Sequence, residues 1–268
     1  MSGSRRMSVP DFVERKGKQK LVCLTAYDVA TASILDAAGV DLILVGDSLG
    51  MVVHGHSNTL RVTLDHMVAH AAAVVRARPR ALVVADMPFL TFHISPEETV
   101  RNAGRLVQEG GVDAVKLEGG TLRVPHVQAL LAAGIPVMGH VGLTPQSVLP
   151  FGGHRVQGRG DDAAERILAD AAALEAAGCF SIVLEGMPAS LAGKVTRALR
   201  IPTIGIGAGA ACDGQILVVH DLLGLFETKF KFVRRYADLR SVMIDAVSRF
   251  RADVVSGAFP SDAETYEE

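Results

Sequence analysis

The amino-acid sequence predicts an α/β fold, a (β/α)₈ TIM barrel with an extra N-terminal helix and a C-terminal helical tail. Eight strand-like apolar segments alternate with helical segments along the 268 residues, and no break in composition separates two domains. Four of the strand-like segments end in an acidic residue, which fits a barrel because the carboxyl ends of its strands meet at one rim. An open, doubly wound sheet is the alternative architecture.

Local sequence signals place the strands and helices. Ser8 can cap a short first helix, with Pro10 and Asp11 in its first turn. Short apolar runs predict strands at residues 21–25, 42–47, 82–86, 114–118, 135–141, 181–185, 202–206 and 216–220. Capping residues, apolar periodicity and terminal glycines predict helices at residues 30–38, 63–76, 95–110, 124–133, 161–178, 188–199 and 230–255.

Two stretches are expected to be loops: residues 51–60 and the Gly- and Pro-rich run 142–160. A structureless loop as long as the second is usually functional in a compact domain, so we expect a lid there. For the domain organisation, we expect a flexible tail at 1–7, a single barrel domain at 8–258 and a C-terminal tail at 259–268.

Composition limits the classes of function. The chain is 49% hydrophobic and 21% charged with a formal net charge of -2, which argues against nucleic-acid or membrane-surface binding. No apolar run approaches the roughly 20 residues that cross a bilayer, and residues 1–7 lack the apolar core of a signal peptide. Cys23, Cys179 and Cys212 form neither a disulfide framework nor a Cys-x-x-Cys pair, so we expect a cytoplasmic protein.

The strand ends carry polar side chains that would share one rim of the barrel. These are Asp47, Ser48, Asp86, Lys116, Glu118, His140, Glu185 and Asp221. By the two-residue period of a strand, Asp47 continues a row through Ile43 and Val45, which we expect to face inward. A single strand-end acid often only caps the next helix, but four that converge indicate a site.

Carboxylates from several strands favour a hard cation. Oxygen ligands with open positions suit Mg²⁺ better than Zn²⁺, which prefers His and Cys. Magnesium chelated by a 2-oxo acid would acidify the neighbouring C–H and stabilise the enolate. Glu185 is our candidate base because its strand lies furthest in sequence from Asp47 and Asp86, and Lys116 would offset charge on a substrate carboxylate or enolate oxygen.

Ordered motifs along nearly the whole chain resemble one enzyme family. The motifs are Gly46-Asp-Ser-Leu-Gly50, Asp86-Met-Pro-Phe89, Val115-Lys-Leu-Glu-Gly-Gly120, Gly139-His-Val-Gly-Leu-Thr-Pro-Gln-Ser147, Gly152-Gly-His-Arg-Val-Gln-Gly158, Gly205-Ile-Gly-Ala-Gly209 and Cys212-Asp-Gly-Gln215. They are similar to those of the ketopantoate hydroxymethyltransferases, barrel enzymes of the phosphoenolpyruvate mutase/isocitrate lyase-like superfamily.

The resemblance implies an activity and its ligands. The expected reaction moves a hydroxymethyl group from 5,10-methylenetetrahydrofolate to 3-methyl-2-oxobutanoate, giving ketopantoate for pantothenate and coenzyme A, with Mg²⁺ as cofactor. Members of the family form large homo-oligomers, commonly decamers.

The resemblance also implies residue roles. Asp47 and Asp86 would bind magnesium, with Glu118 near the metal directly or through water, and Glu185 would accept the proton. Contacts to the oxo acid are implied for Asp47, Ser48, Asp86 and Lys116. His140 is a further candidate, either to bind the substrate carboxylate or to support the metal ligands.

Departures from the family pattern lie in loops. Thr91-Phe92 stands where a Ser-Tyr pair is expected, and His154 stands where an aromatic residue usually follows Gly153. The segment 225–232 matches only loosely. These differences bear on lid packing and subunit contacts more than on the metal chemistry.

A zinc amidohydrolase is the main alternative. His54-Gly-His56 resembles the His-x-His motif of that class, and Lys116, His140 and Asp221 fall at strand ends where it needs ligands. The motif follows the second strand rather than lying on the first, and strand six supplies Glu185 instead of histidine, which weakens this hypothesis.

Further alternatives remain at the level of sequence. His66 and His70 have a metal-binding spacing but no third ligand nearby, and Gly205–Gly214 could bind phosphate or simply allow close backbone approach. Lys116 could form a Schiff base, although carboxylates beside it favour the ammonium form. Another Mg²⁺-dependent 2-oxo acid aldolase or lyase of the same superfamily, or a non-enzymatic scaffold, would also fit the fold.

Overall fold

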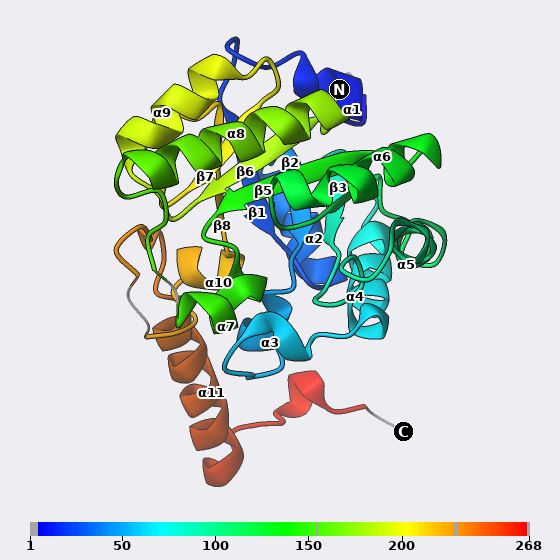
Figure 1. Cartoon of the computed structure of the whole chain (residues 1–268). Coiled ribbons are helices and arrows are strands. Elements are labelled where there is room, and N and C mark those ends of the chain that lie inside the picture. The colour runs from blue at the N-terminus through cyan, green and yellow to red at the C-terminus, as the bar shows by residue number, and fades with distance from the viewer. Residues whose placement is uncertain (1–4, 154, 228–229, 267–268) are drawn as a thin grey trace. The chain divides into compact units, whose positions relative to one another are not determined.

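The computed structural model describes residues 5–153, 155–227 and 230–266. Its strands form a closed parallel barrel in which each strand pairs with the next in chain order and β8 pairs with β1 (Figure 1). The strands are β1 Leu21–Thr25, β2 Leu42–Val45, β3 Leu82–Asp86, β4 Ala114–Lys116, β5 Val137–Gly142, β6 Ser181–Glu185, β7 Thr203–Ile206 and β8 Gly214–Leu217. The predicted (β/α)₈ fold is therefore confirmed.

In the described ranges, helices connect the strands from β1 to β7 on the outside of this barrel, one helix precedes β1, and two helices follow β8 in the chain (Figure 1). They are α1 Val9–Val13, α2 Val29–Ala37, α3 Leu49–Val52, α4 Leu64–Arg76, α5 Pro96–Gln108, α6 Val124–Ala132, α7 Val148–Phe151, α8 Asp161–Ala177, α9 Ala189–Ala198, α10 Val219–Leu222 and α11 Leu239–Ser256. Four short 3₁₀ turns complete the described structure: η1 Thr59–Arg61, η2 Thr121–Arg123, η3 Pro145–Ser147 and η4 Asp262–Glu264. The extra N-terminal helix and the helical C-terminal tail are both present.

Several elements differ from the sequence-based expectation. Strands β2 and β4 end at Val45 and Lys116 rather than at 47 and 118, β5 starts at Val137 rather than at 135, and β8 ends at Leu217 rather than at 220. The eighth strand starts at Gly214, two residues before the predicted start at 216, because residue 214 already pairs with Leu21 of β1. Only glycine fits at this close approach, since an added Cβ would lie 2.6 Å from the Leu21 carbonyl oxygen. The tail helix begins at Leu239 rather than at 230, where Asp238 accepts a hydrogen bond from the Ser241 N–H and caps it. Short helices α3 and α7 lie next to or within the expected loops.

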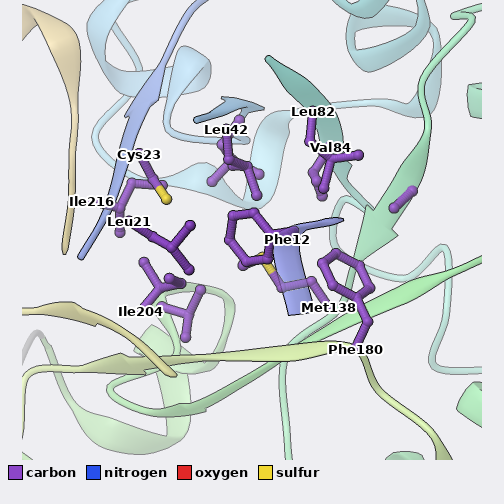
Figure 2. Packing of buried hydrophobic residues seen from close by; sticks show 13 residues of the cluster. Phe12, Leu21, Cys23, Leu42, Leu82, Val84, Met138, Phe180, Ile204 and Ile216 are labelled. Atoms are coloured by element: carbon purple, nitrogen blue, oxygen red, sulfur yellow. The ribbon is translucent and has the colours of Figure 1, made fainter. Parts of the chain in front are cut away.

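The barrel interior is filled by apolar side chains from all eight strands, with Phe12 of α1 among them (Figure 2). Phe12 is fully buried and packs edge-on against Phe180 at 6.0 Å between ring centroids. From β2 the cluster takes Leu42 and Leu44, so the inward row runs through even-numbered residues. The expectation that Asp47 extends an inward row through Ile43 and Val45 was therefore wrong.

Aspartates at the amino ends of three strands tie the barrel to the N-terminal segment. Each accepts a hydrogen bond from a backbone N–H of the preceding strand and pairs with a cation from residues 6–16. The pairs are Arg15–Asp41, Arg6–Asp113 and Lys16–Asp213, with backbone donors Val22, Val83 and Thr203. The N-terminal segment thus closes the end of the barrel opposite the predicted rim.

The chain divides into two compact units, residues 1–218 and 219–268. The second contains α10, α11 and η4, and α11 buries none of its side chains in the isolated chain. Several exposed side chains of α11 are large and apolar: Val242, Met243, Ile244, Val247, Phe250, Val254 and Val255. Of the helices in the described ranges, none has the length and apolar character needed to cross a membrane.

Candidate active site

The inward rows of four strands lead directly to ionisable side chains. Val84 of β3 is followed on the same face by Asp86, Ala114 of β4 by Lys116, Met138 of β5 by His140, and Val183 of β6 by Glu185. Glu118 continues the row of β4 two residues further. The apolar interior therefore ends in a layer of charged groups at the carboxyl ends of the strands.

Asp47 reaches this layer by a different route. Strand β2 ends at Val45, and residues 46–48 turn into α3, which brings the Asp47 N–H to 3.0 Å from Asp86 Oδ2. Gln146 then holds the Asp47 carboxylate: its Nε2 donates to Asp47 Oδ2 at 2.8 Å and to the Met87 carbonyl at 2.9 Å. A tight turn and a loop amide position this acid, not strand alternation.

A buried ion pair joins the second acid to the lysine. Lys116 Nζ lies 2.8 Å from Asp86 Oδ1, and both side chains are 5% exposed. Burial opposes protonation of Lys116, but Asp86, Glu118 and Asp47 outweigh it and raise its pKa. Lys116 is therefore an ammonium ion, a poor nucleophile, which disfavours the Schiff-base alternative.

His140 lies between the two glutamates of the site. Its Nδ1 is 3.5 Å from Glu118 Oε1 and 3.2 Å from Lys116 Nζ, and its Nε2 is 3.3 Å from Glu185 Oε2. Burial and Lys116 oppose protonation of the imidazole, but the two carboxylates outweigh them and raise the pKa of His140 to about 9. In this arrangement a cationic His140 holds the Glu185 side chain in place.

Acidic side chains crowd Asp47 and disfavour its charged form. Burial, Asp86 and Glu118 raise its pKa well above the usual aspartate range. Beside it, Gln146 Oε1 is buried without a hydrogen-bond partner, while its backbone N–H donates to Glu118 Oε2 at 2.9 Å. A divalent cation would relieve the repulsion between these acids, so the donor set fits Mg²⁺.

The geometry sets the type of metal site that is feasible. Among the described residues, no three His, Cys, Asp or Glu side chains are arranged in their present conformations to hold a metal ion. Magnesium is commonly held by one or two carboxylates, with substrate and water as the other ligands. Asp47 and Asp86 suit that mode better than a cage made wholly of protein ligands.

Most of the residues expected at the rim lie in this one network: Asp47, Asp86, Lys116, Glu118, His140 and Glu185. Ser48 follows Asp47, and its Oγ lies 2.9 Å from the hydroxyl oxygen of Tyr27, a buried side chain. Asp221 belongs to the second unit, and His154 lies outside the described residues.

Sequence analysis missed two contacts of the network, those of Tyr27 and Gln146. Gln146 stood within the quoted motif Leu143-Thr-Pro-Gln-Ser147, but its role depends on a contact with Asp47, 99 positions earlier. Tyr27 follows β1, and its place at a strand end was the available signal.

The alternative histidine motif forms a separate group. The His54 ring lies 4.7 Å from that of His66 and 5.6 Å from that of His70. His66 Nδ1 accepts a hydrogen bond from the Thr63 N–H and caps α4, and His70 Nδ1 lies 2.7 Å from the Tyr27 carbonyl oxygen. Helix capping and packing account for these histidines without a zinc site.

The glycines after β7 are explained by packing. An added Cβ at Gly209 would lie 2.5 Å from the Cβ of Ala189, and one at Gly205 would lie 2.9 Å from Cys212 Sγ. Close approach of neighbouring segments therefore requires glycine at these positions, which favours the packing interpretation over a phosphate loop.

Comparisons with known proteins give matches over nearly the whole chain. A sequence profile described as "Ketopantoate hydroxymethyltransferase" matches residues 6–262. The 3-methyl-2-oxobutanoate hydroxymethyltransferase of Pelobacter propionicus is 53% identical over 264 residues, covering 98% of each chain. That of Pyrobaculum calidifontis is 55% identical over 257 residues, covering 96% of this chain and 97% of its own.

Solved structures share the fold at low sequence identity. A phosphonopyruvate hydrolase in complex with oxalate and Mg²⁺ aligns with a TM-score of 0.63 and 13% identity, covering 96% of this chain and 93% of its own. 2,3-Dimethylmalate lyase, a PEP mutase/isocitrate lyase superfamily member, aligns with a TM-score of 0.61 and 20% identity, covering 95% and 89%.

Proposed function

The chain belongs to the ketopantoate hydroxymethyltransferase family, and we propose that it transfers a hydroxymethyl group from 5,10-methylenetetrahydrofolate to 3-methyl-2-oxobutanoate. The product is ketopantoate, the precursor of pantothenate and coenzyme A. The observation that carries the proposal is the buried network in which Asp47 and Asp86 meet beside Lys116, while His140 holds Glu185 at its edge.

Asp47 and Asp86 are the proposed magnesium ligands, with Glu118 next to them. Bound magnesium would supply Lewis-acid stabilisation of the enolate oxygen. Support comes from the donor set and from the solved structure of the same fold that contains oxalate, a small dicarboxylate, together with Mg²⁺. Lys116 and Ser48 are proposed to bind the oxo acid, because an ammonium group and a hydroxyl group suit its carboxylate and keto oxygens.

Glu185 is proposed to remove the C3 proton of the oxo acid. Its side chain is 18% exposed, whereas that of Glu118 is 4% exposed, so Glu185 is the more accessible of the two glutamates beside His140. The C3 carbon then bonds to the one-carbon unit of the donor as that unit leaves the folate nitrogens, and water supplies the hydroxyl oxygen. His140 would position the Glu185 carboxylate for this step.

Solvent-deuterium exchange at C3 of 3-methyl-2-oxobutanoate, measured with Mg²⁺ and without folate, isolates proton removal from transfer. Wild-type protein should exchange the C3 proton, and Glu185→Gln should lower the rate by about 100-fold or more while retaining magnesium and oxo-acid binding. Glu109→Gln, an exposed change at the C-cap of α5, is the matched control. Undiminished exchange in Glu185→Gln would remove this residue from the role of base.

The exchange assay, together with zinc chelators and borohydride trapping, discriminates the alternatives. A zinc hydrolase would show no exchange and would be inhibited by zinc chelators. A Schiff-base enzyme would form a covalent adduct on Lys116 when borohydride is added with substrate. A scaffold protein would do neither.

We also propose that the chain forms a homo-oligomer, a decamer as the family resemblance implies. The apolar side chains exposed along α11 support association. The expected cytoplasmic location stays a prediction.

A further inference from the structure

A second polar group lies beside the network, in the segments that follow β3 and β4. It consists of His93, from the segment after β3, and Arg123, at the end of η2. His93 Nδ1 and Arg123 Nε are both buried, and neither has a hydrogen-bond partner. Buried polar atoms in folded proteins are nearly always paired, so these two atoms indicate a missing partner.

Arg123 is held in a fixed place against Gly119 and Phe92. Its side chain passes over Gly119, whose φ is +113°, and an added Cβ there would lie 3.1 Å from Arg123 Cγ and 3.3 Å from Nε. On its other side, Arg123 Cζ lies 5.4 Å from the centroid of the Phe92 ring. The guanidinium is therefore positioned by a glycine and an aromatic ring rather than by an acid.

The charge of Arg123 is not balanced by a neighbouring carboxylate. Among the described residues no ion pair involves it, and burial lowers its pKa, although arginine stays protonated at neutral pH. Arg105, by contrast, pairs with Asp65 and Glu109. A guanidinium placed in this way suits a carboxylate supplied by a ligand.

His93 adds a neutral polar group and an aromatic surface. Its ring lies 4.1 Å from the Phe92 ring and 5.3 Å from the Phe89 ring. Burial and the Arg123 charge lower the pKa of His93 to about 4, whereas Glu118 acts in the opposite direction. Arg123 packs over Gly119, the residue that directly follows Glu118, so this group borders the proposed metal site.

We propose that Arg123 and His93 form a subsite for a carboxylate of the glutamate tail of the folate donor. This inference rests on the proposed function. The oxo acid already has Lys116 and Ser48 for its polar groups, and the donor is the other anionic substrate. The partly exposed ring of Phe89 suits the aminobenzoyl ring that precedes the glutamate.

Exposed apolar side chains in the same segments fit this assignment. Leu90, Ile94 and Leu122 are 52%, 66% and 82% exposed. They offer apolar surface to a large co-substrate on the segments that carry His93 and Arg123.

A pair of donors tests the subsite: 5,10-methylenetetrahydrofolate and 5,10-methylenetetrahydropteroate, which lacks the glutamate. Wild-type protein should have the lower KM for the folate donor. Arg123→Met should raise the KM for the folate donor about tenfold or more and leave that for the pteroate donor within twofold, because only the first loses a charge-assisted hydrogen bond. Arg123→Lys should have a KM for the folate donor between those of the wild type and Arg123→Met. Arg101→Met, an exposed change on α5, is the matched control and should behave as wild type.

Turnover of the pteroate donor reports a folded active site in each variant, so a loss specific to the folate donor is not a folding defect. Equal wild-type KM values for the two donors, or a change in Arg123→Met that affects both donors alike, would overturn the subsite. If wild-type protein exchanges no C3 deuterium, the proposed function fails instead, whatever the donor measurements show.

Discussion

At the scale of single residues, the site is made of charges whose pKa values depend on contacts between distant strands. Alternation holds for Val183 and Glu185, because β6 extends to Glu185. It failed for Asp47, because the chain leaves β2 at Val45 and the turn that follows obeys no period. A two-residue period is informative only as far as the strand extends.

His93 makes the stability of the protein depend on pH. Its pKa is near 6.5 in the unfolded chain and about 4 in the folded protein, so between these values the unfolded state binds the additional proton. The contribution of neutral His93 is therefore complete above pH 6.5 and is lost as the pH falls toward 4. Because the side chain is only half-buried, the loss should be about 1–2 kcal/mol rather than the full value of the shift.

Urea denaturation of wild type and His93→Gln from pH 7 to 4 measures this contribution. The wild-type free energy of unfolding should fall more steeply with decreasing pH than that of the glutamine variant, whose side chain does not titrate. Parallel curves for the two proteins would show that His93 is accessible to protons in the folded state.

Some residue roles could not be inferred from sequence. Gln146 and Arg123 are ordinary polar residues in loops or turns, and nothing in their immediate neighbours marks them. Their importance comes from contacts with Asp47 and Gly119 that only the folded chain makes. The strand-end acids could be identified because a barrel makes every strand end part of one rim.

At the scale of elements, the N-terminal segment stabilises the barrel through an ion pair and a hydrogen bond. Lys16 Nζ lies 2.7 Å from Asp213 Oδ2 and donates to the Thr196 carbonyl at 2.8 Å, with its side chain 20% exposed. Asp213 Oδ2 also accepts from the Thr203 N–H at 2.9 Å. One lysine therefore joins the segment after α1 to α9, β7 and β8.

Lys16→Met should lower the free energy of unfolding by about 1–3 kcal/mol, because it leaves buried acceptors without their charged donor. Thermal denaturation should show a midpoint several degrees lower, roughly 2–4 °C for each kcal/mol in a chain of this size. Lys18→Met, an exposed change two residues further on, should have little effect. Equal midpoints for the two variants would show that the contacts of Lys16 contribute nothing to stability.

Most elements could be predicted because their signals are local. Ser95 and Pro96 start α5 as expected, and Gly178 ends α8 in the left-handed conformation. The start of β8 could not be predicted in this way, since glycine is uncommon within strands and Gly214 is required only by the close approach of Leu21. Errors arose where a neighbouring strand, rather than the segment itself, determines the structure.

At the scale of the whole molecule, the closed barrel could be predicted because eight alternating strand and helix signals leave few other topologies. How far the barrel extends along the chain is less evident from sequence. Residues 1–218 hold all eight strands, and residues 219–268 form a unit of their own. The predicted single domain at 8–258 and the two tails stay predictions.

The exposed apolar side chains of α11 give the last prediction. A helix without a buried face is not stabilised by its own chain, since a helix of this length gains most of its stability from packing. The side chains of Val247, Phe250 and Val254, three or four residues apart, can form one apolar stripe for a second copy to cover.

Light scattering after size-exclusion chromatography should therefore give a lower mass for a chain truncated after Asp238 than for the full chain. The truncated chain should keep a cooperative thermal transition, because all eight strands remain. Phe250→Asp should shift the mass in the same direction, whereas Arg251→Asp, its exposed neighbour, serves as the charge control. A full-length mass in both the truncated chain and Phe250→Asp would mean that the subunits associate through another surface.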